Sequence, residues 1–225
     1  MRILLTAATR AEIAPLTEYM GARWQAAGAD RFVKGAHQIK VLISGVGMTA
    51  TAYRLTRLLG DERFDLALQA GIAGSFDRTV PLGSVVRISD EVFADLGAED
   101  HYQFRDIFDL GLEQPDLFPF SQKRLIAPEP ELPPLKALTA VPGLTVNMVT
   151  GSSFTATQRL MQFNCVTESM EGAPFHYVCL QEKLPFVQIR SISNYVEARN
   201  RADWRIGEAV ANLNDFLTEF MDSLA

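Results

Sequence analysis

Five polar segments, each beside a short apolar run, hold the side chains of this chain that could do chemistry. They are "TAATRAE" (6–12), "QAGIAGSF" (69–76), "TGSSFTAT" (150–157), "ESMEGAP" (168–174) and "IRSISN" (189–194). In an α/β sheet, ligands bind where strands end. Two carboxylates, Glu12 and Glu171, and the amide of Asn194 are therefore predicted to face one polar ligand. Singly, each has a plainer explanation, since an acid can merely complement a helix dipole and an asparagine can cap a turn.

The elements that must position these segments alternate along the chain. Runs rich in Val, Ile and Leu predict strands at 2–7, 39–47, 65–74, 83–93, 144–154, 163–170 and 185–193. Helical periodicity follows at 49–59, 171–184 and 203–225. Strands that alternate with helices predict an α/β fold around a mainly parallel sheet. A length of 225 residues suits one catalytic domain, 1–225.

Composition excludes several classes of protein. The chain is 48% hydrophobic and 21% charged, with a net charge of −6 and no basic stripe, so nucleic acid is not an expected partner. No stretch is long enough to span a membrane, and the N-terminal run is too short for a signal peptide. Cys165 and Cys179 make no disulfide framework, which favours a cytoplasmic location. The three histidines have no second ligand at a recognisable spacing, so no metal or other cofactor is implied.

The stretch at about 95–137 is the exception to the regular pattern. It is acidic, aromatic and rich in proline, and shows neither helical nor strand periodicity. Loops of this length are usually binding loops, lids or oligomer contacts. A simple excursion packed on the surface is an equal alternative.

The motif "GVGMTA" (45–50) fits the dinucleotide-binding pattern G-x-G-x-x-A. Such a site also needs an acid about 20 residues on, at the end of the next strand. Asp65 has the spacing but precedes its strand. We therefore expect a tight strand-to-helix turn here and no bound dinucleotide.

Taken in order, "AEI", "GIAG", "SSF", "SMEG" and "IRSISN" resemble the purine nucleoside phosphorylase and nucleosidase superfamily, and most closely its methylthioadenosine/S-adenosylhomocysteine nucleosidases. The resemblance covers nearly the whole chain. It implies a three-layer α/β/α fold with a central mixed β-sheet, a nucleoside substrate, and assembly as a homodimer or a larger homo-oligomer.

The resemblance assigns the purine to residues from three segments. Phe154 matches the residue that stacks on the base, beside backbone groups of Ser153 and Thr155 on the purine edge. The glycine-containing turn "GIAG" lets its backbone approach a ligand closely, so Ala73 and Gly74 are expected to bind substrate.

The resemblance also assigns the sugar and the nucleophile. Met170 and Glu171 match the pair beneath the ribose, where the glutamate binds both hydroxyls. Glu12 matches the acid that holds and deprotonates the attacking water in the hydrolases. Arg190 is expected to position the site without acting as a catalyst.

Ser193 and Asn194 match the catalytic position at N7 of the base, where nucleosidases acting on 6-aminopurines carry Asp. An amide donates through its NH₂ group and accepts through its carbonyl. A 6-oxopurine protonated on N7 presents the complementary pair, whereas adenine does not. Asn194 therefore predicts selection for hypoxanthine or guanine, with roughly 10⁴-fold discrimination if the mismatch leaves buried groups unpaired.

Water is favoured over phosphate as the nucleophile. The phosphorylases use a glycine-rich first turn and arginines, whereas "AATRAE" offers only Arg10 and adds a carboxylate that repels anions. Three alternatives stay open: an adenine-releasing nucleosidase that tolerates Asn194, a 6-oxopurine nucleoside phosphorylase, and a non-catalytic purine nucleoside-binding protein.

The stretch "GAEDHYQFRDIFDLGL" (97–112), together with the amide at 194, resembles one branch of the hydrolases. The substrate of that branch carries an aromatic carboxylate on the 5′ side. Arg78, His101 and Arg105 are candidates to bind this group, and the stretch at 95–137 is expected to help cover that end of the substrate.

Overall fold

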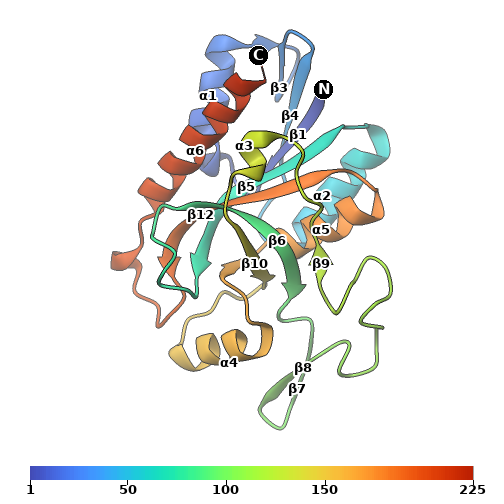
Figure 1. The fold of residues 1–225 in the computed structure, drawn as a ribbon, viewed down its shortest axis with the longest axis vertical. Coiled ribbons are helices and arrows are strands. Elements are labelled where there is room, and N and C mark those ends of the chain that lie inside the picture. The colour runs from blue at the N-terminus through green and yellow to red at the C-terminus, as the bar shows by residue number, and fades with distance from the viewer. Residues whose placement is uncertain (225) are drawn as a thin grey trace.

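The computed structural model describes residues 1–224 and is built on one large mixed sheet (Figure 1). The strands are β1 (Arg2–Ala7), β2 (Gln25–Ala26), β3 (Arg31–Lys34), β4 (His37–Ile43), β5 (Leu66–Ser75), β6 (Val85–Phe93), β7 (Gly97–Asp100), β8 (Gln103–Asp106), β9 (Leu125–Ile126), β10 (Ala140–Thr145), β11 (Thr167–Ser169) and β12 (Phe186–Tyr195). The helices are η1 (Arg10–Glu12), α1 (Ala14–Arg23), α2 (Met48–Asp61), α3 (Pro133–Lys136), α4 (Ser153–Phe163), α5 (Gly172–Gln181), η2 (Arg201–Asp203) and α6 (Ile206–Ser223).

The strand order explains why distant segments meet. The path runs β11-β10-β6-β12-β5-β1-β4-β3-β2, and β9 pairs with β6. Strands β4, β1, β5 and β12 are all parallel, whereas β12 and β6 are antiparallel. The segment that follows β1 and the last residues of β5 and β12 therefore lie at the same end of the sheet, where these parallel strands finish. The mixed sheet expected from the resemblance is confirmed.

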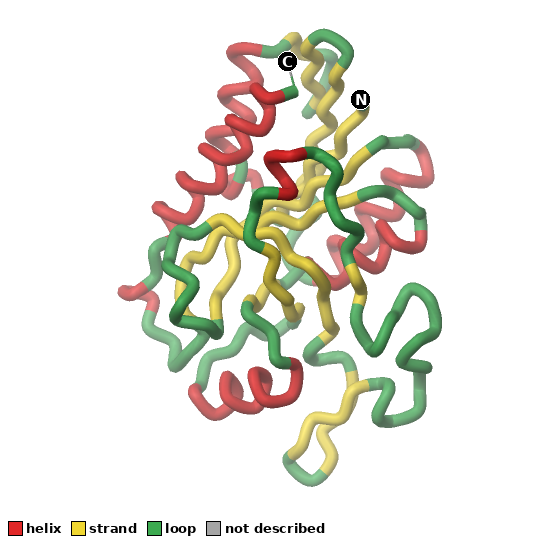
Figure 2. Tube along the Cα trace, in the orientation of Figure 1, coloured by secondary structure: helices red, strands yellow, loops and turns green. Residues whose placement is uncertain are grey.

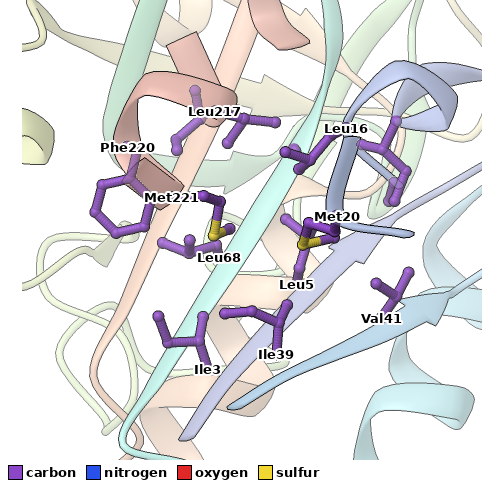
Figure 3. Packing of buried hydrophobic residues seen from close by; sticks show 14 of the residues in the cluster. Ile3, Leu5, Leu16, Met20, Ile39, Val41, Leu68, Leu217, Phe220 and Met221 are labelled. Atoms are coloured by element: carbon purple, nitrogen blue, oxygen red, sulfur yellow. The ribbon is translucent and has the colours of Figure 1, made fainter. Parts of the chain in front are cut away.

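Helices cover both faces of the sheet, which completes the three layers (Figure 2). Helices α1 and α6 pack on one face, where Leu16, Met20 and Leu217 meet side chains from β1, β4 and β5 (Figure 3). Helices α2 and α5 pack on the opposite face around Leu55 and Phe175. Fully buried aliphatic and aromatic side chains each stabilise the fold by about 1.5–3 kcal/mol, so both helical layers contribute to the stability of the sheet.

The sequence prediction was wrong between 144 and 170. The predicted strand at 144–154 ends at Thr145, because β10 spans only Ala140–Thr145. The side chain of Ser152 then accepts a hydrogen bond from the backbone N–H of Thr155 and starts α4, a helix that the apolar pattern did not indicate. The predicted strand at 163–170 is shortened to β11, because α4 extends through Phe163 and Asn164 ends it in the left-handed conformation.

The stretch at 95–137 forms an extended excursion with little regular structure. It contains the β7–β8 hairpin, β9 and the single turn α3. Phe104, Phe108 and Phe120 pack into two small apolar clusters, while the rings of Tyr102 and Phe118 are exposed. The hairpin lies beside the α4 end of the molecule in Figure 1.

No helix within residues 1–224 is long and apolar enough to cross a membrane. Cys165 and Cys179 are free thiols in the interior, as expected.

Candidate active site

A cavity of about 410 Å³ lies at the carboxyl ends of the central parallel strands. Its lining draws on the turn after β1, the ends of β5 and β12, the β11–α5 junction and the start of α6. Seven of the residues predicted from the sequence line it: Glu12, Ala73, Gly74, Met170, Glu171, Ser193 and Asn194. Segments as far apart in the chain as the turn after β1 and the start of α6 thus form one concave surface.

Glu12 is held by its own turn. It ends the short helix η1, and its Oε2 atom accepts hydrogen bonds from the backbone N–H of Thr9 (2.8 Å) and from the hydroxyl of Thr9 (3.0 Å). The backbone N–H of Ile72 lies 3.4 Å from the other oxygen, Oε1. Because Oε2 carries most of these bonds, Oε1 keeps lone-pair capacity for a ligand in the cavity.

Glu171 is the residue immediately before α5, and it is buried. Its Oε1 accepts a hydrogen bond from the backbone N–H of Gly47 at 3.0 Å, and its Oε2 lies 3.7 Å from Nη2 of Arg190. Burial raises the pKa of Glu171, while the charge of Arg190 and the Gly47 bond oppose that rise. The oxygens of this desolvated side chain can accept hydrogen bonds from the hydroxyl groups of a ligand.

The "GVGMTA" turn contributes to the site through its backbone. Gly47 adopts φ +89°, a left-handed conformation that favours glycine, and this conformation aims its N–H at Glu171. The sequence motif indicated a tight turn correctly, but its contribution to the cavity was missed.

Arg190 lies behind the cavity wall and does not line it. Its side chain is 1% exposed, and Nη2 donates to Oε1 of Gln69 at 3.1 Å. A Cβ atom on Gly71 would come within 2.2 Å of the Arg190 guanidinium and 2.9 Å of Glu12 Oε1. The absence of a side chain at position 71 thus lets Arg190 and the carboxylate of Glu12 approach the same stretch of β5.

Asn194 is turned into the cavity by a β-bulge. The register between β12 and β5 shifts between Ile192 and Asn194, which leaves Ser193 as the extra residue. Asn194 Nδ2 donates to the carbonyl of Tyr195 at 3.0 Å, and its Oδ1 lies 2.8 Å from the hydroxyl of Ser193. A carbonyl can only accept, so the Tyr195 contact fixes which end of the amide is the donor.

The segment expected to bind the purine plane is placed differently from the prediction. Ser153, Phe154 and Thr155 do not line the cavity, and the ring of Phe154 is 70% exposed on the first turn of α4. The backbone N–H of Thr155 is already used by the Ser152 cap. Thr150, in the loop before α4, is the part of this segment that lines the cavity.

Two contributions to the site were not assigned from the sequence, although Glu168 belongs to the polar segment "ESMEGAP". Glu168 lines the cavity, but its carboxylate pairs with Nη1 of the buried Arg159 at 2.9 Å and accepts from the backbone N–H of Thr150 at 2.8 Å. This pair fastens the loop before α4 to β11. An apolar rim is formed by Val46, Trp204, Ile206 and Val210, residues that no local motif connects.

The three side chains suggested for the 5′-side carboxylate all lie outside the cavity lining. Arg78 is ion-paired with Glu197 and stacks on Tyr195, with its Cζ atom 4.8 Å from the ring centroid. His101 and Arg105 lie on the β7–β8 hairpin, and His101 pairs with Asp100. Within residues 1–224, no three His, Cys, Asp or Glu side chains gather in an arrangement suited to a metal ion.

The cavity thus brings two carboxylates, an oriented amide and several apolar side chains together where the strands end. Residues 2–223 match the profile of the phosphorylase superfamily, and the chain belongs to that family.

A curated relative, futalosine hydrolase of Streptomyces coelicolor, is 36% identical over 78% of this chain and 75% of its own length. Two solved structures from Helicobacter pylori share the fold. One is 5′-methylthioadenosine/S-adenosylhomocysteine nucleosidase in complex with a pyrrolidine compound (TM-score 0.81, 18% identity, 99% of this chain and 98% of that chain). The other is a mutant of futalosine hydrolase (TM-score 0.81, 19% identity, 99% of each chain). The chain is therefore a homologue of futalosine hydrolase on a nucleosidase-like fold.

Proposed function

We propose that this protein hydrolyses the N-glycosidic bond of futalosine and releases hypoxanthine, a step of menaquinone biosynthesis. The observation that carries the proposal is the orientation of the Asn194 amide. With Nδ2 on the Tyr195 carbonyl and Oδ1 on Ser193, one Nδ2 hydrogen and one Oδ1 lone pair stay free. They match O6 and N7–H of a 6-oxopurine.

The same two atoms mismatch adenine. A 6-aminopurine offers hydrogens beside a bare N7, and an amide has no acidic proton to give to N7. Homology at 36% identity to futalosine hydrolase supports the same choice of substrate class.

The sugar is assigned to the carboxylate that the fold buries. Glu171 is nearly enclosed by the Gly47 turn and Arg190, and its charge suits the 2′- and 3′-hydroxyls of a ribose. When the C1′–N9 bond lengthens, positive charge develops on the ribose. Two fixed carboxylates, Glu12 and Glu171, stabilise that charge in a site partly shielded from water.

Glu12 is assigned to the attacking water. Its Oε1 atom keeps capacity to accept a hydrogen bond, and a carboxylate within reach of a water can take its proton as the oxygen adds to C1′. Asn194 holds N7–H and O6 of the departing base without acting as an acid.

Charge in the cavity supports hydrolysis over phosphorolysis. Among the described residues, the lining contains four glutamates and a single basic side chain, Arg199. Arg10, the one arginine of the first turn, pairs with Asp30 and does not line the cavity. An inorganic phosphate beside Glu12 and Glu171 would face repulsion from both.

The deciding experiment measures free base after incubation with futalosine, inosine, adenosine and methylthioadenosine, each with and without phosphate. We expect hypoxanthine from futalosine at a rate that phosphate does not change. Release of adenine at a comparable rate, a strict need for phosphate, or recovery of every nucleoside intact would each refute the proposal in favour of one of the alternatives.

A substitution tests the role of the amide. Asn194→Asp, when its carboxyl is protonated, donates to N7 and accepts from a 6-amino group. We expect the adenine-to-hypoxanthine rate ratio to rise by roughly 10⁴-fold, with adenine release increasing as the pH falls. Loss of both activities without a change of preference would contradict this role, and Asn194→Ala is the matched control expected to behave that way.

We also infer that the protein forms a homodimer or a larger homo-oligomer in the cytoplasm. Large apolar side chains are exposed on the excursion and near α2, namely Tyr53, Tyr102, Leu112, Leu117 and Phe118. Apolar surface of this kind commonly becomes an interface. Light scattering coupled to size-exclusion chromatography tests the assembly, and a mass of one chain at micromolar concentration would contradict it.

A further inference from the structure

Within residues 1–224, the ionic pairs around the cavity leave two lining side chains without an ion-pair partner, the acid Glu12 and the base Arg199. Of the four glutamates in the lining, Glu168 is neutralised by Arg159 and Glu197 by Arg78. Glu171 faces Arg190. Arg199, the one basic side chain in the lining, has no ion-pair partner within residues 1–224.

Arg199 is fixed by its backbone and leaves its head group available. Its N–H donates to the carbonyl of Gly151 at 3.3 Å, which ties the segment after β12 to the loop before α4. The side chain is exposed, and Cζ lies 5.2 Å from the ring centroid of Trp204. Stacking on an aromatic face leaves the N–H groups at the guanidinium edge free for an anion.

The position of this group in the cavity indicates which part of a ligand it meets. The groups assigned to the base and to the hydroxyls, Asn194 and Glu171, lie on the inner side and are half-buried or buried. Arg199 and Ile206 line the cavity and are exposed, and Trp204 beside them is half-buried, so these three side chains form its solvent-facing rim. A nucleoside held by its base and its 2′- and 3′-hydroxyls has only its 5′ substituent left to extend toward this rim.

We propose that Arg199 binds the carboxylate on the 5′ side of the substrate, with Trp204 and Ile206 covering the apolar part of that substituent. This inference rests on the proposed function and deepens it, since futalosine is an inosine whose 5′ substituent ends in an aromatic carboxylate. Arg199 is thus a specificity-determining residue, whereas Arg78 neutralises Glu197 beside it.

The test compares futalosine with its methyl ester, which has the same shape and lacks the charge. Arg199→Gln should raise KM for futalosine by about tenfold or more, as expected for a lost charge-assisted hydrogen bond, and leave KM for the ester unchanged. Arg199→Lys should retain part of the preference for the acid. Added salt should raise KM for futalosine in the wild type much more than in Arg199→Gln.

Arg201→Gln is the matched control. Arg201 stacks on the same ring, with Cζ 5.9 Å from its centroid, but does not line the cavity. It should behave as the wild type. An effect of Arg201→Gln as large as that of Arg199→Gln would overturn the proposal, because general charge in the segment would then account for it.

A binding measurement separates this inference from the proposed reaction. Titration calorimetry in the Glu12→Gln background, with and without Arg199→Gln, reports affinity for the acid and the ester without turnover. Weaker binding of the acid alone supports the inference even if no base is released. Equal weakening of acid and ester would overturn it and assign Arg199 to the nucleoside portion. Failure of the wild type to cleave futalosine refutes only the reaction.

Discussion

Two polar regions meet at the start of α5 and use the same residue type in opposite ways. On one side, Glu12 and Glu171 line an open cavity. On the other, Glu91 is enclosed: Gln188 Nε2 donates to its Oε1 at 2.9 Å and the hydroxyl of Thr145 donates to its Oε2 at 2.9 Å. Access to the cavity, and not the presence of a carboxylate, separates a group available for chemistry from one that holds the fold.

The enclosed region supports the open one mechanically. Thr145 accepts a hydrogen bond from the backbone N–H of Ala173 at 2.7 Å, in the first turn of α5, while it donates to Glu91. A Cβ atom on Gly172 would come within 1.9 Å of Glu91. The interior acid thereby fixes the first turn of the helix that follows Glu171.

His176 belongs to the same interior. Its Nδ1–H donates to the carbonyl of Leu125 at 3.0 Å, which links α5 to β9. Burial lowers the pKa of His176 to about 4, so the ring is neutral at pH 7 and serves packing.

The largest expected effect comes from a substitution in the open cavity. Glu12→Gln removes the base that activates water and should lower kcat by about 10²–10⁴-fold. Because the amide still accepts hydrogen bonds from Thr9, the melting temperature should change little. Rates of hypoxanthine release and thermal denaturation of the same preparation check both statements, and near-normal turnover would remove Glu12 from the mechanism.

The second prediction concerns Glu168, which lines the cavity and is held by the ion pair with Arg159. Arg159→Met leaves the buried Glu168 without its partner and should cost about 3–5 kcal/mol of unfolding free energy. Urea denaturation measures the loss. Arg57→Met, at an exposed position on α2, is the control and should change stability by less than about 0.5 kcal/mol. A small effect of Arg159→Met would show that Glu168 does not depend on this pair.

The third prediction concerns the enclosed region, where replacing Glu91 should raise the stability that replacing Arg159 lowers. Burial raises the pKa of Glu91 to about 7, against the opposing hydrogen bonds of Gln188 and Thr145. The folded state therefore binds this proton more tightly than the unfolded state, and stability falls as the pH rises from about 4.5 to above 7.

Glu91→Gln keeps the shape without the charge. It should stabilise the protein by up to roughly 3 kcal/mol at pH 8 and by little at pH 4. Urea denaturation at both pH values checks the difference. A gain that is equal at both pH values would show that Glu91 does not titrate in this range.

Much of the fold was predictable because buried strands appear in the sequence as short runs of apolar residues. The runs at 2–7, 65–74 and 185–193 correspond to β1, β5 and β12 to within two residues at each end. These three strands position the site. By contrast, α4 was missed because the apolar run at 144–154 passes through a turn whose helix start depends on the Ser152 cap.

The sequence by itself determined which groups are available: the carboxylates at 12 and 171, the amide at 194 and the glycines that let backbone approach. These properties depend on residue type and on position at the end of an apolar run, so they can be identified from the sequence. Tertiary structure decided everything that depends on distance. Both Glu168 and Glu171 line the cavity, but Glu168 is tightly paired with Arg159 at 2.9 Å, whereas Glu171 lies 3.7 Å from Arg190. None of the three candidate cations, Arg78, His101 and Arg105, lines the cavity, whereas Arg199 does. The order of residues along the chain does not specify such neighbours in space.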